Sequence, residues 1–140
     1  MSISSFEPTN YEQEYYIYHL ELLSAFCRQL EQLPPFNNEY RSEDDAEFLA
    51  ALTQLQQQHQ DQNFLEYGQM LLCRIVSSYP HLMPLLYRDL LWFFGGDCLH
   101  FMPDNEITIF QQLDEQREAA KAQNISFSYK EARAKLMGMH

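Results

Sequence analysis

The sequence predicts an all-α protein, a compact bundle of five or six helices in a single domain. Apolar side chains recur at intervals of three and four residues, which is the period of amphipathic helices. Only four glycines and six prolines occur in 140 residues, fewer than the tight turns of an all-β protein would need. Hydrophobic residues make up 46% of the chain, enough to offset the conformational entropy lost on folding. We therefore expect one domain over residues 1–140, since domains most often contain about 100 to 150 residues.

The first helix is expected from Tyr11 to Leu33, after a polar N-terminal segment of about ten residues. Pro34 and Pro35 end it, because proline lacks the amide donor and disfavours helix at the residue before it. A polar loop follows through Arg41. The residues that recur on one face of this helix are Tyr15, Tyr18, Leu22, Ala25, Phe26, Leu30 and Leu33.

Ser42, three residues before Asp45, opens an acidic first turn that suits the positive end of a helix dipole. The second helix is expected from there, and its last turns run into the glutamine-rich connection 54–63. A third helical stripe spans Phe64–Ser78, so that two antiparallel helices are implied. The apolar residues of the second helix are Phe48, Leu49, Leu52 and Leu55, and those of the third begin with Phe64, Tyr67, Leu71 and Ile75.

A fourth helix is expected over Met83–Phe94, ended by Gly95-Gly96 because glycine readily adopts the left-handed conformation of a helix C-cap. The pair Pro103-Asp104 starts a fifth helix that reaches about Ala122. Ser128 and Glu131 then form a capping box for a short basic helix to about Met137. No segment repeats at a fixed period, and an orthogonal bundle is as compatible with this pattern as an up-and-down one.

The charge is strongly negative and unevenly distributed. The formal net charge of −11 opposes nonspecific attraction to nucleic acid or anionic lipid. Residues 1–66 contain twelve acidic residues and only two basic ones, whereas residues 117–140 contain five basic and two acidic residues. Either these are solvated helix faces whose basic end stabilises its own acidic neighbours, or the basic end docks an acidic partner.

Several signals predict a cytoplasmic protein that does not enter a membrane. Residues 1–14 are polar and acidic, unlike a signal peptide. The most apolar segment, Leu82–Phe94, contains Pro84, Arg88 and Asp89, and is shorter than the roughly 20 residues of a membrane span. The three cysteines are odd in number and have no CxxC spacing, which favours reduced thiols over a disulfide framework.

The densest group of chemically active side chains lies in the segment Arg88–His100, with two adjacent charges, the only tryptophan, a glycine pair, a thiol and an imidazole. The stretch Tyr87–Asp114, which includes the helix start Pro103-Asp104 and the pair Phe110-Gln111, resembles an uncharacterised family of small helical proteins from gammaproteobacteria. The resemblance extends over most of the chain. Some members of that family are described as dehydrogenases, but no GxGxxG motif after a strand supports a nucleotide-binding sheet here. The resemblance therefore implies a fold and a compartment rather than a reaction.

Asp97, Cys98 and His100 are the candidate ligand or metal cluster, with Arg88 beside them and Trp92 as the wall of a pocket. Carboxylate, thiolate and imidazole are all metal ligands, and the three side chains could converge if this turn were helical. A structural zinc site normally needs four ligands, and the other histidines show no paired spacing. The structural alternative is that Asp97 closes a loop, Cys98 packs as a small buried side chain and His100 hydrogen-bonds locally.

Cys98 is also a candidate nucleophile. His100 could serve as its base, and Asp97 or Asp89 as the group that orients the base. No signature of a cysteine hydrolase surrounds them, and Arg88 and Asp89 suit ion pairs or helix caps. We therefore assign no catalytic residue and expect no cofactor.

Tyr11 and Tyr16 fall off the core stripe of the first helix and are expected to be exposed, where tyrosine favours protein interfaces. The five methionines from Met70 onward are expected to fill the core or lie in the tail rather than to form a ligand site.

Three functions remain open. The first is a noncatalytic interaction or regulatory protein, with a homo-oligomer as one form of it, which requires an exposed apolar patch. The second is a small ligand- or metal-binding domain or enzyme built on Arg88–His100, which requires a pocket there. The third is a nucleic-acid binder through residues 117–135, which requires those bases on one exposed face.

Overall fold

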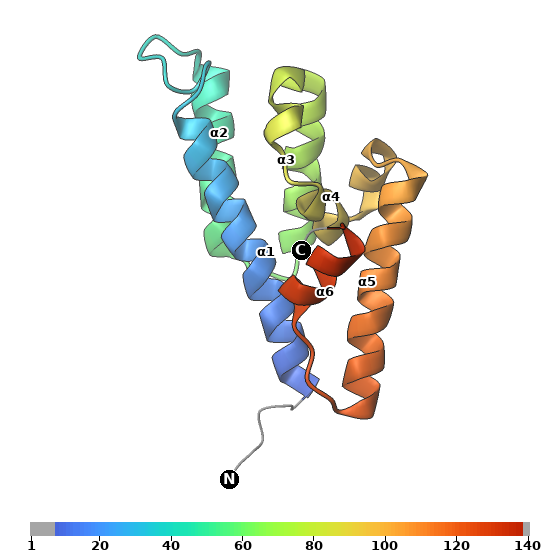
Figure 1. Cartoon of the computed structure of the whole chain (residues 1–140). Coiled ribbons are helices and arrows are strands. Elements are labelled where there is room, and N and C mark those ends of the chain that lie inside the picture. Colours follow the sequence, from blue (N-terminus) through green and yellow to red (C-terminus); the bar gives the residue numbers. More distant parts are fainter. Residues whose placement is uncertain (1–7, 139–140) are drawn as a thin grey trace. The chain divides into compact units, whose positions relative to one another are not determined.

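A computed structural model describes residues 8–138 of the chain (Figure 1). Within this range there are six α-helices, three short 3₁₀ helices and no strand, so the predicted all-α class is confirmed. Contacts divide the described chain into a terminal unit, residues 8–18 with 103–138, and a central unit, residues 19–102. Helix α1 (Pro8–Glu31) contributes to both. That the chain forms one domain stays a prediction.

The central unit contains the second part of α1 and most of the remaining elements. Figure 1 shows α2 and α3 side by side and antiparallel, as the sequence predicts. Helix α3 also contacts η2, α4 and η3. The elements are α2 (Glu43–Leu55), η1 (Gln56–Gln58), α3 (Phe64–Ser78), η2 (Pro80–Leu85), α4 (Arg88–Phe94) and η3 (Gly96–Phe101).

Aromatic rings form two groups in the core of the central unit. Phe36, Phe48 and Tyr79 have ring centroids 5.0 to 5.9 Å apart, which holds the loop after α1 against α2 and the end of α3. Phe64, at the start of α3, lies 5.4 Å from Phe94 in α4. Such offset and tilted pairs add to the free energy gained by burying the rings.

The predicted fourth helix differs from the observed chain. Met83–Phe94 was expected to be one helix, but η2 ends at Leu85, and Leu86 and Tyr87 are extended with ψ of 121° and 127° before α4 begins at Arg88. Pro84 lies inside η2, in what would be the first turn of the expected helix, where a missing amide donor costs little; the break follows at the extended Leu86 and Tyr87. The predicted end is confirmed, because Gly95 has φ of +67° after Phe94.

The terminal unit contains the first part of α1, α5 (Asp104–Gln123) and α6 (Tyr129–Leu136), with α6 packed on α5. Tyr129 is buried, and its ring centroid lies 5.2 Å from that of Tyr15 and 5.1 Å from that of Tyr18. Ser128 accepts a hydrogen bond from the Glu131 amide at 3.2 Å, which confirms the predicted start of α6.

Part of the basic C-terminal region is neutralised within the terminal unit. Arg117 Nη1 lies 3.0 Å and Lys121 Nζ 3.1 Å from Oε1 of Glu12. The Arg117 guanidinium also lies 4.1 Å from the ring centroid of Tyr15, a cation–π contact. For these two residues, the basic end does stabilise acidic neighbours of its own chain. Arg117 is buried, so the bases at 117–135 do not all share the exposed face that a nucleic-acid binder requires.

No helix in the described part of the chain is both long enough and apolar enough to cross a membrane.

Candidate functional site

The segment Arg88–His100 is built into the core of the central unit. Arg88 Nη2 donates to the carbonyl oxygen of Phe101 at 2.8 Å, which ties the first residue of α4 to the last residue of η3. Asp89 is buried and Trp92 is half-buried. Arg88 thus joins the two ends of this turn.

The glycine turn in this segment fits closely against α3. A Cβ atom added to Gly96 would lie 2.6 Å from Oε1 of Gln69, and Gln69 Nε2 donates to the carbonyl oxygen of Phe94 at 2.8 Å. Gly96 therefore allows the chain after α4 to approach α3, beyond the C-cap role that the sequence indicates for Gly95.

The structure does not bring Asp97, Cys98 and His100 together as a ligand set. Cys98 is fully buried, whereas Asp97 and His100 are exposed. Burial, reinforced by the neighbouring Cys73, raises the pKa of the Cys98 thiol to about 12, so it is protonated at neutral pH. Metal binding and nucleophilic attack both require the thiolate. Between residues 8 and 138, no three His, Cys, Asp or Glu side chains are grouped so that they could hold a metal ion.

The two tyrosines expected at an interface lie in different environments. Tyr11 is only 5% exposed, and its hydroxyl donates to the carbonyl oxygen of Ile125. Its expected exposure is therefore wrong, because Tyr11 lies one helical turn before Tyr15 and shares its buried face. Tyr16 is half-buried, and burial raises the pKa of its hydroxyl. The large apolar side chain exposed on this part of α1 is Ile17, at 56%.

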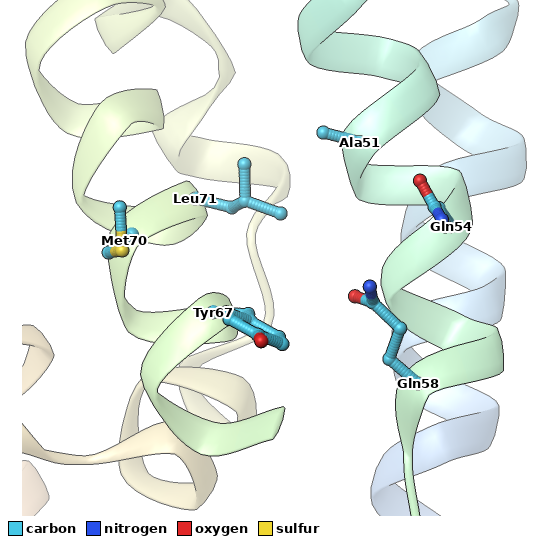
Figure 2. Close-up of a pocket in the computed structure, with 6 residues that line it drawn as sticks. All are labelled: Ala51, Gln54, Gln58, Tyr67, Met70 and Leu71. Atoms are coloured by element: carbon cyan, nitrogen blue, oxygen red, sulfur yellow. The ribbon is translucent and has the colours of Figure 1, made fainter. Parts of the chain in front are cut away.

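The central unit has an open cavity of about 230 Å³ between α2 and α3, which we call the α2–α3 groove (Figure 2). Figure 2 shows the α3 side chains on one side of it and those of α2 and η1 on the other, with Tyr67 and Gln58 pointing toward each other. A second hollow, of about 480 Å³, lies along α2 and shares Gln54 with the groove. The groove is lined by Ala51, Gln54, Gln58, Tyr67, Met70 and Leu71.

Met70 is the most exposed apolar residue of the groove, at 71%, and the expectation that it fills the core is wrong. Its neighbours Tyr67 and Leu71 lie on the predicted core stripe of α3 but are only half-buried, because the groove leaves their side chains partly open. The position of Met70 in the helical period indicates its exposure. Met70 lies off that stripe, one turn after the exposed Glu66.

A family comparison identifies the chain. The sequence profile of the PA2817-like family matches residues 11–140. The chain belongs to this family. No curated protein and no solved structure matches the chain. The match supports the expected membership of an uncharacterised family.

The groove of this PA2817-like chain lies in an acidic part of the central unit. Residues 43–78 contain six acidic residues and one basic residue, Arg74. The Arg74 guanidinium lies 5.3 Å from the ring centroid of Phe48, so this cation also has an aromatic partner. The acidic side chains that are exposed are Glu43, Asp44, Glu47, Asp61 and Glu66. The potential around the groove is therefore negative.

Asp45, another acidic residue of the α2–α3 hairpin, makes a hydrogen bond within the central unit. The Tyr79 hydroxyl donates to Oδ1 of Asp45 at 2.6 Å, and this hydrogen bond lowers the pKa of the carboxyl group. Burial, followed by the hydrogen bond to Asp45, raises the pKa of Tyr79 to about 12. The pair joins the first turn of α2 to the residue after α3, and so fixes one end of the hairpin that carries the groove.

Proposed function

We propose that this PA2817-like chain is a noncatalytic interaction protein of the bacterial cytoplasm that binds another protein through the α2–α3 groove. The observation that carries the proposal is Met70, which is 71% exposed at the mouth of an open, largely apolar cavity. Burying a methionine side chain contributes about 1.5 to 3 kcal/mol, and its flexible thioether adapts to different partner surfaces. Leu65, on the same helix, is a further exposed apolar residue at 42%.

The lining of the groove supports binding rather than chemistry. Alkyl, thioether, amide and phenol groups face the cavity, without a carboxylate, imidazole or thiol among them. Gln54 and Gln58 each offer an amide donor and an amide acceptor, which suits a peptide backbone or a polar side chain. Of these groups only the Tyr67 phenol is titratable, and the lining places no nucleophile and no second acid–base group beside it, as general acid–base or nucleophilic catalysis would need.

Charge complementarity selects the partner. Glu47 lies one turn before Ala51 on α2, and Glu66 lies one turn before Met70 on α3, so exposed carboxylates flank the groove on both helices. The partner segment we propose carries one apolar anchor for the cavity beside Met70, with lysine or arginine residues on either side of it. An acidic segment would meet like charge there.

Site-specific photocrosslinking in the source cells tests the proposal. A benzophenone amino acid replaces Met70 in one variant and Tyr40, a loop residue that is 85% exposed, in a matched control. We expect the probe at position 70 to capture a protein that the probe at position 40 does not, through a peptide rich in lysine and arginine. That peptide is then synthesised, and its Kd is measured for the wild-type chain and for Met70→Glu and Tyr40→Glu.

Met70→Glu should weaken binding of this peptide at least about tenfold, because it loses the apolar contact, whereas Tyr40→Glu should leave the Kd within about twofold. The Kd should also rise with NaCl concentration. Equal capture from both positions, an acidic crosslinked peptide, or a Kd that Met70→Glu does not change would each overturn the proposal. Capture of a second copy of this chain would replace the basic partner by self-association.

A further inference from the structure

The packing of η3 on α3 places two of the three cysteines next to each other. Sγ of Cys98 lies 3.9 Å from the carbonyl oxygen of Gln69 in α3. Cys73 follows Gln69 by one helical turn, and so its side chain leaves α3 on the same face. The two thiols interact, because Cys73 is one of the neighbours that raise the pKa of Cys98.

The contacts around this pair hold the two segments in place. Gly96 approaches the Gln69 side chain closely, and Gln69 donates to the Phe94 carbonyl oxygen. Both contacts fix the turn that carries Cys98 against the turn of α3 that carries Cys73. A disulfide between these turns requires the two side chains to turn toward each other.

The two thiols differ in their access to solvent. Cys73 is partly exposed, whereas Cys98 has no exposed surface. A small oxidant in solution therefore meets Cys73 first, and Cys98 is the neighbour that can attack an oxidised Cys73. Cys27 is buried elsewhere, with its Sγ 3.7 Å from the carbonyl oxygen of Leu52 in α2, and burial raises its pKa to about 12.

We propose that Cys73 and Cys98 are an oxidation site that forms a reversible intramolecular disulfide, joining α3 to η3, when the chain meets hydrogen peroxide. The Cys73 thiolate attacks one peroxide oxygen, which breaks the O–O bond and gives the Cys73 sulfenic acid and a hydroxide ion. That hydroxide takes the Cys98 proton to form water, and the Cys98 thiolate attacks the sulfenic sulfur. The second hydroxide leaves and takes the proton that the Cys73 thiol had released, which gives the second water. Two thiols are oxidised and one peroxide is reduced to two waters.

Peptide mass mapping of the full-length wild-type chain tests this proposal. The reduced chain is treated with a small excess of hydrogen peroxide, unfolded in the presence of a thiol-alkylating reagent and digested with trypsin. Cleavage after Arg41, Arg74, Arg88 and Arg117 puts the two cysteines on the separate peptides 42–74 and 89–117. We expect these two peptides to be linked, with Cys27 alkylated and dithiothreitol restoring all three thiols.

Two variants provide the controls. Cys27→Ala should still form the linked peptide, whereas Cys73→Ser should leave Cys98 alkylated after the same treatment, because its thiol is buried. The oxidised wild-type chain should also unfold at a higher temperature than the reduced chain, since the cross-link restricts the unfolded state.

The proposal fails if oxidation links two copies of the chain through Cys73, if Cys73 proceeds to sulfinic acid with Cys98 still alkylated, or if all three thiols survive. Each of these results would mean that the sulfurs do not meet within one folded chain. None of them bears on the α2–α3 groove, because the test does not involve a partner protein.

Discussion

Replacement of Gly68 by alanine tests the packing of α4 on α3, which positions the whole Arg88–His100 segment. A Cβ atom at position 68 would lie 2.1 Å from Cε1 and 2.2 Å from Cδ1 of Phe94. Phe94 is 2% exposed, and its ring centroid is 5.4 Å from that of Phe64 and 5.1 Å from that of Phe93. The ring therefore has no free space into which it can move.

Two opposing effects determine how much Gly68→Ala changes the free energy of unfolding. Alanine is favoured over glycine inside a helix by about 1 kcal/mol. Overpacking a filled core costs about 1 to 3 kcal/mol, and a separation near 2 Å to a confined ring belongs at the upper end of that range. The expected net loss is thus about 2 kcal/mol in the free energy of unfolding, or roughly a thirtyfold lower ratio of folded to unfolded chain at 25 °C.

Urea unfolding followed by far-UV circular dichroism measures this loss. The double variant Gly68→Ala with Phe94→Leu is the control, because the smaller leucine side chain leaves room for the new methyl group. The two changes should be less than additive, with a coupling energy of about 1 kcal/mol or more. A Gly68→Ala chain as stable as the wild type, or more stable, would refute the close contact between α3 and α4.

Three further predictions concern single contacts. Tyr79→Phe removes the hydrogen bond that lowers the pKa of Asp45 in the folded chain. The stability that this bond contributes is present above the unfolded pKa near 3.8 and is lost as the pH falls through the lower pKa of the folded chain. The melting temperature of the variant should therefore fall less on acidification than that of the wild type. Arg117→Ala should lower the free energy of unfolding by about 2 kcal/mol, since it removes a buried guanidinium that pairs with the half-exposed Glu12 and makes a cation–π contact. Lys121→Ala, whose ammonium is more exposed and pairs with the same Glu12, should cost less than about 1 kcal/mol in the same urea assay. Ser42→Ala should cost about 1 kcal/mol by removing the cap of α2, and no loss of stability would contradict the cap.

The sequence predicts the fold well where a local signal decides the structure. Ser42 accepts a hydrogen bond from the Asp45 amide, Ser128 from the Glu131 amide, and Gly95 takes a positive φ of +67° after α4. Each of these interactions joins residues at most three positions apart, so residue type and spacing contain the whole signal. The break at Leu86 depends on how η2 packs, and the helical period alone could not show it.

The candidate site was harder to predict, because exposure depends on which neighbouring element covers a helix face. Met70 and Leu72 are two residues apart in α3, yet one is 71% exposed and the other fully buried. Tyr11 is covered because its hydroxyl bonds to the carbonyl oxygen of Ile125, which is 114 positions away. Similarly, no CxxC spacing relates Cys73 to Cys98, and only the packing of η3 on α3 brings their thiols together.

Helix α3 carries both proposals on different faces. Tyr67 and Met70 face the groove, whereas Gln69 and Cys73 face η3. Neighbouring positions on an α-helix are about 100° apart, so adjacent residues such as Gln69 and Met70 can serve different surfaces. A change at Met70 therefore removes an apolar contact from the groove without moving the backbone that holds Cys73. Because the two surfaces share a helix but no side chain, loss of partner binding in Met70→Glu should leave disulfide formation intact, and loss of the disulfide in Cys73→Ser should leave partner binding intact.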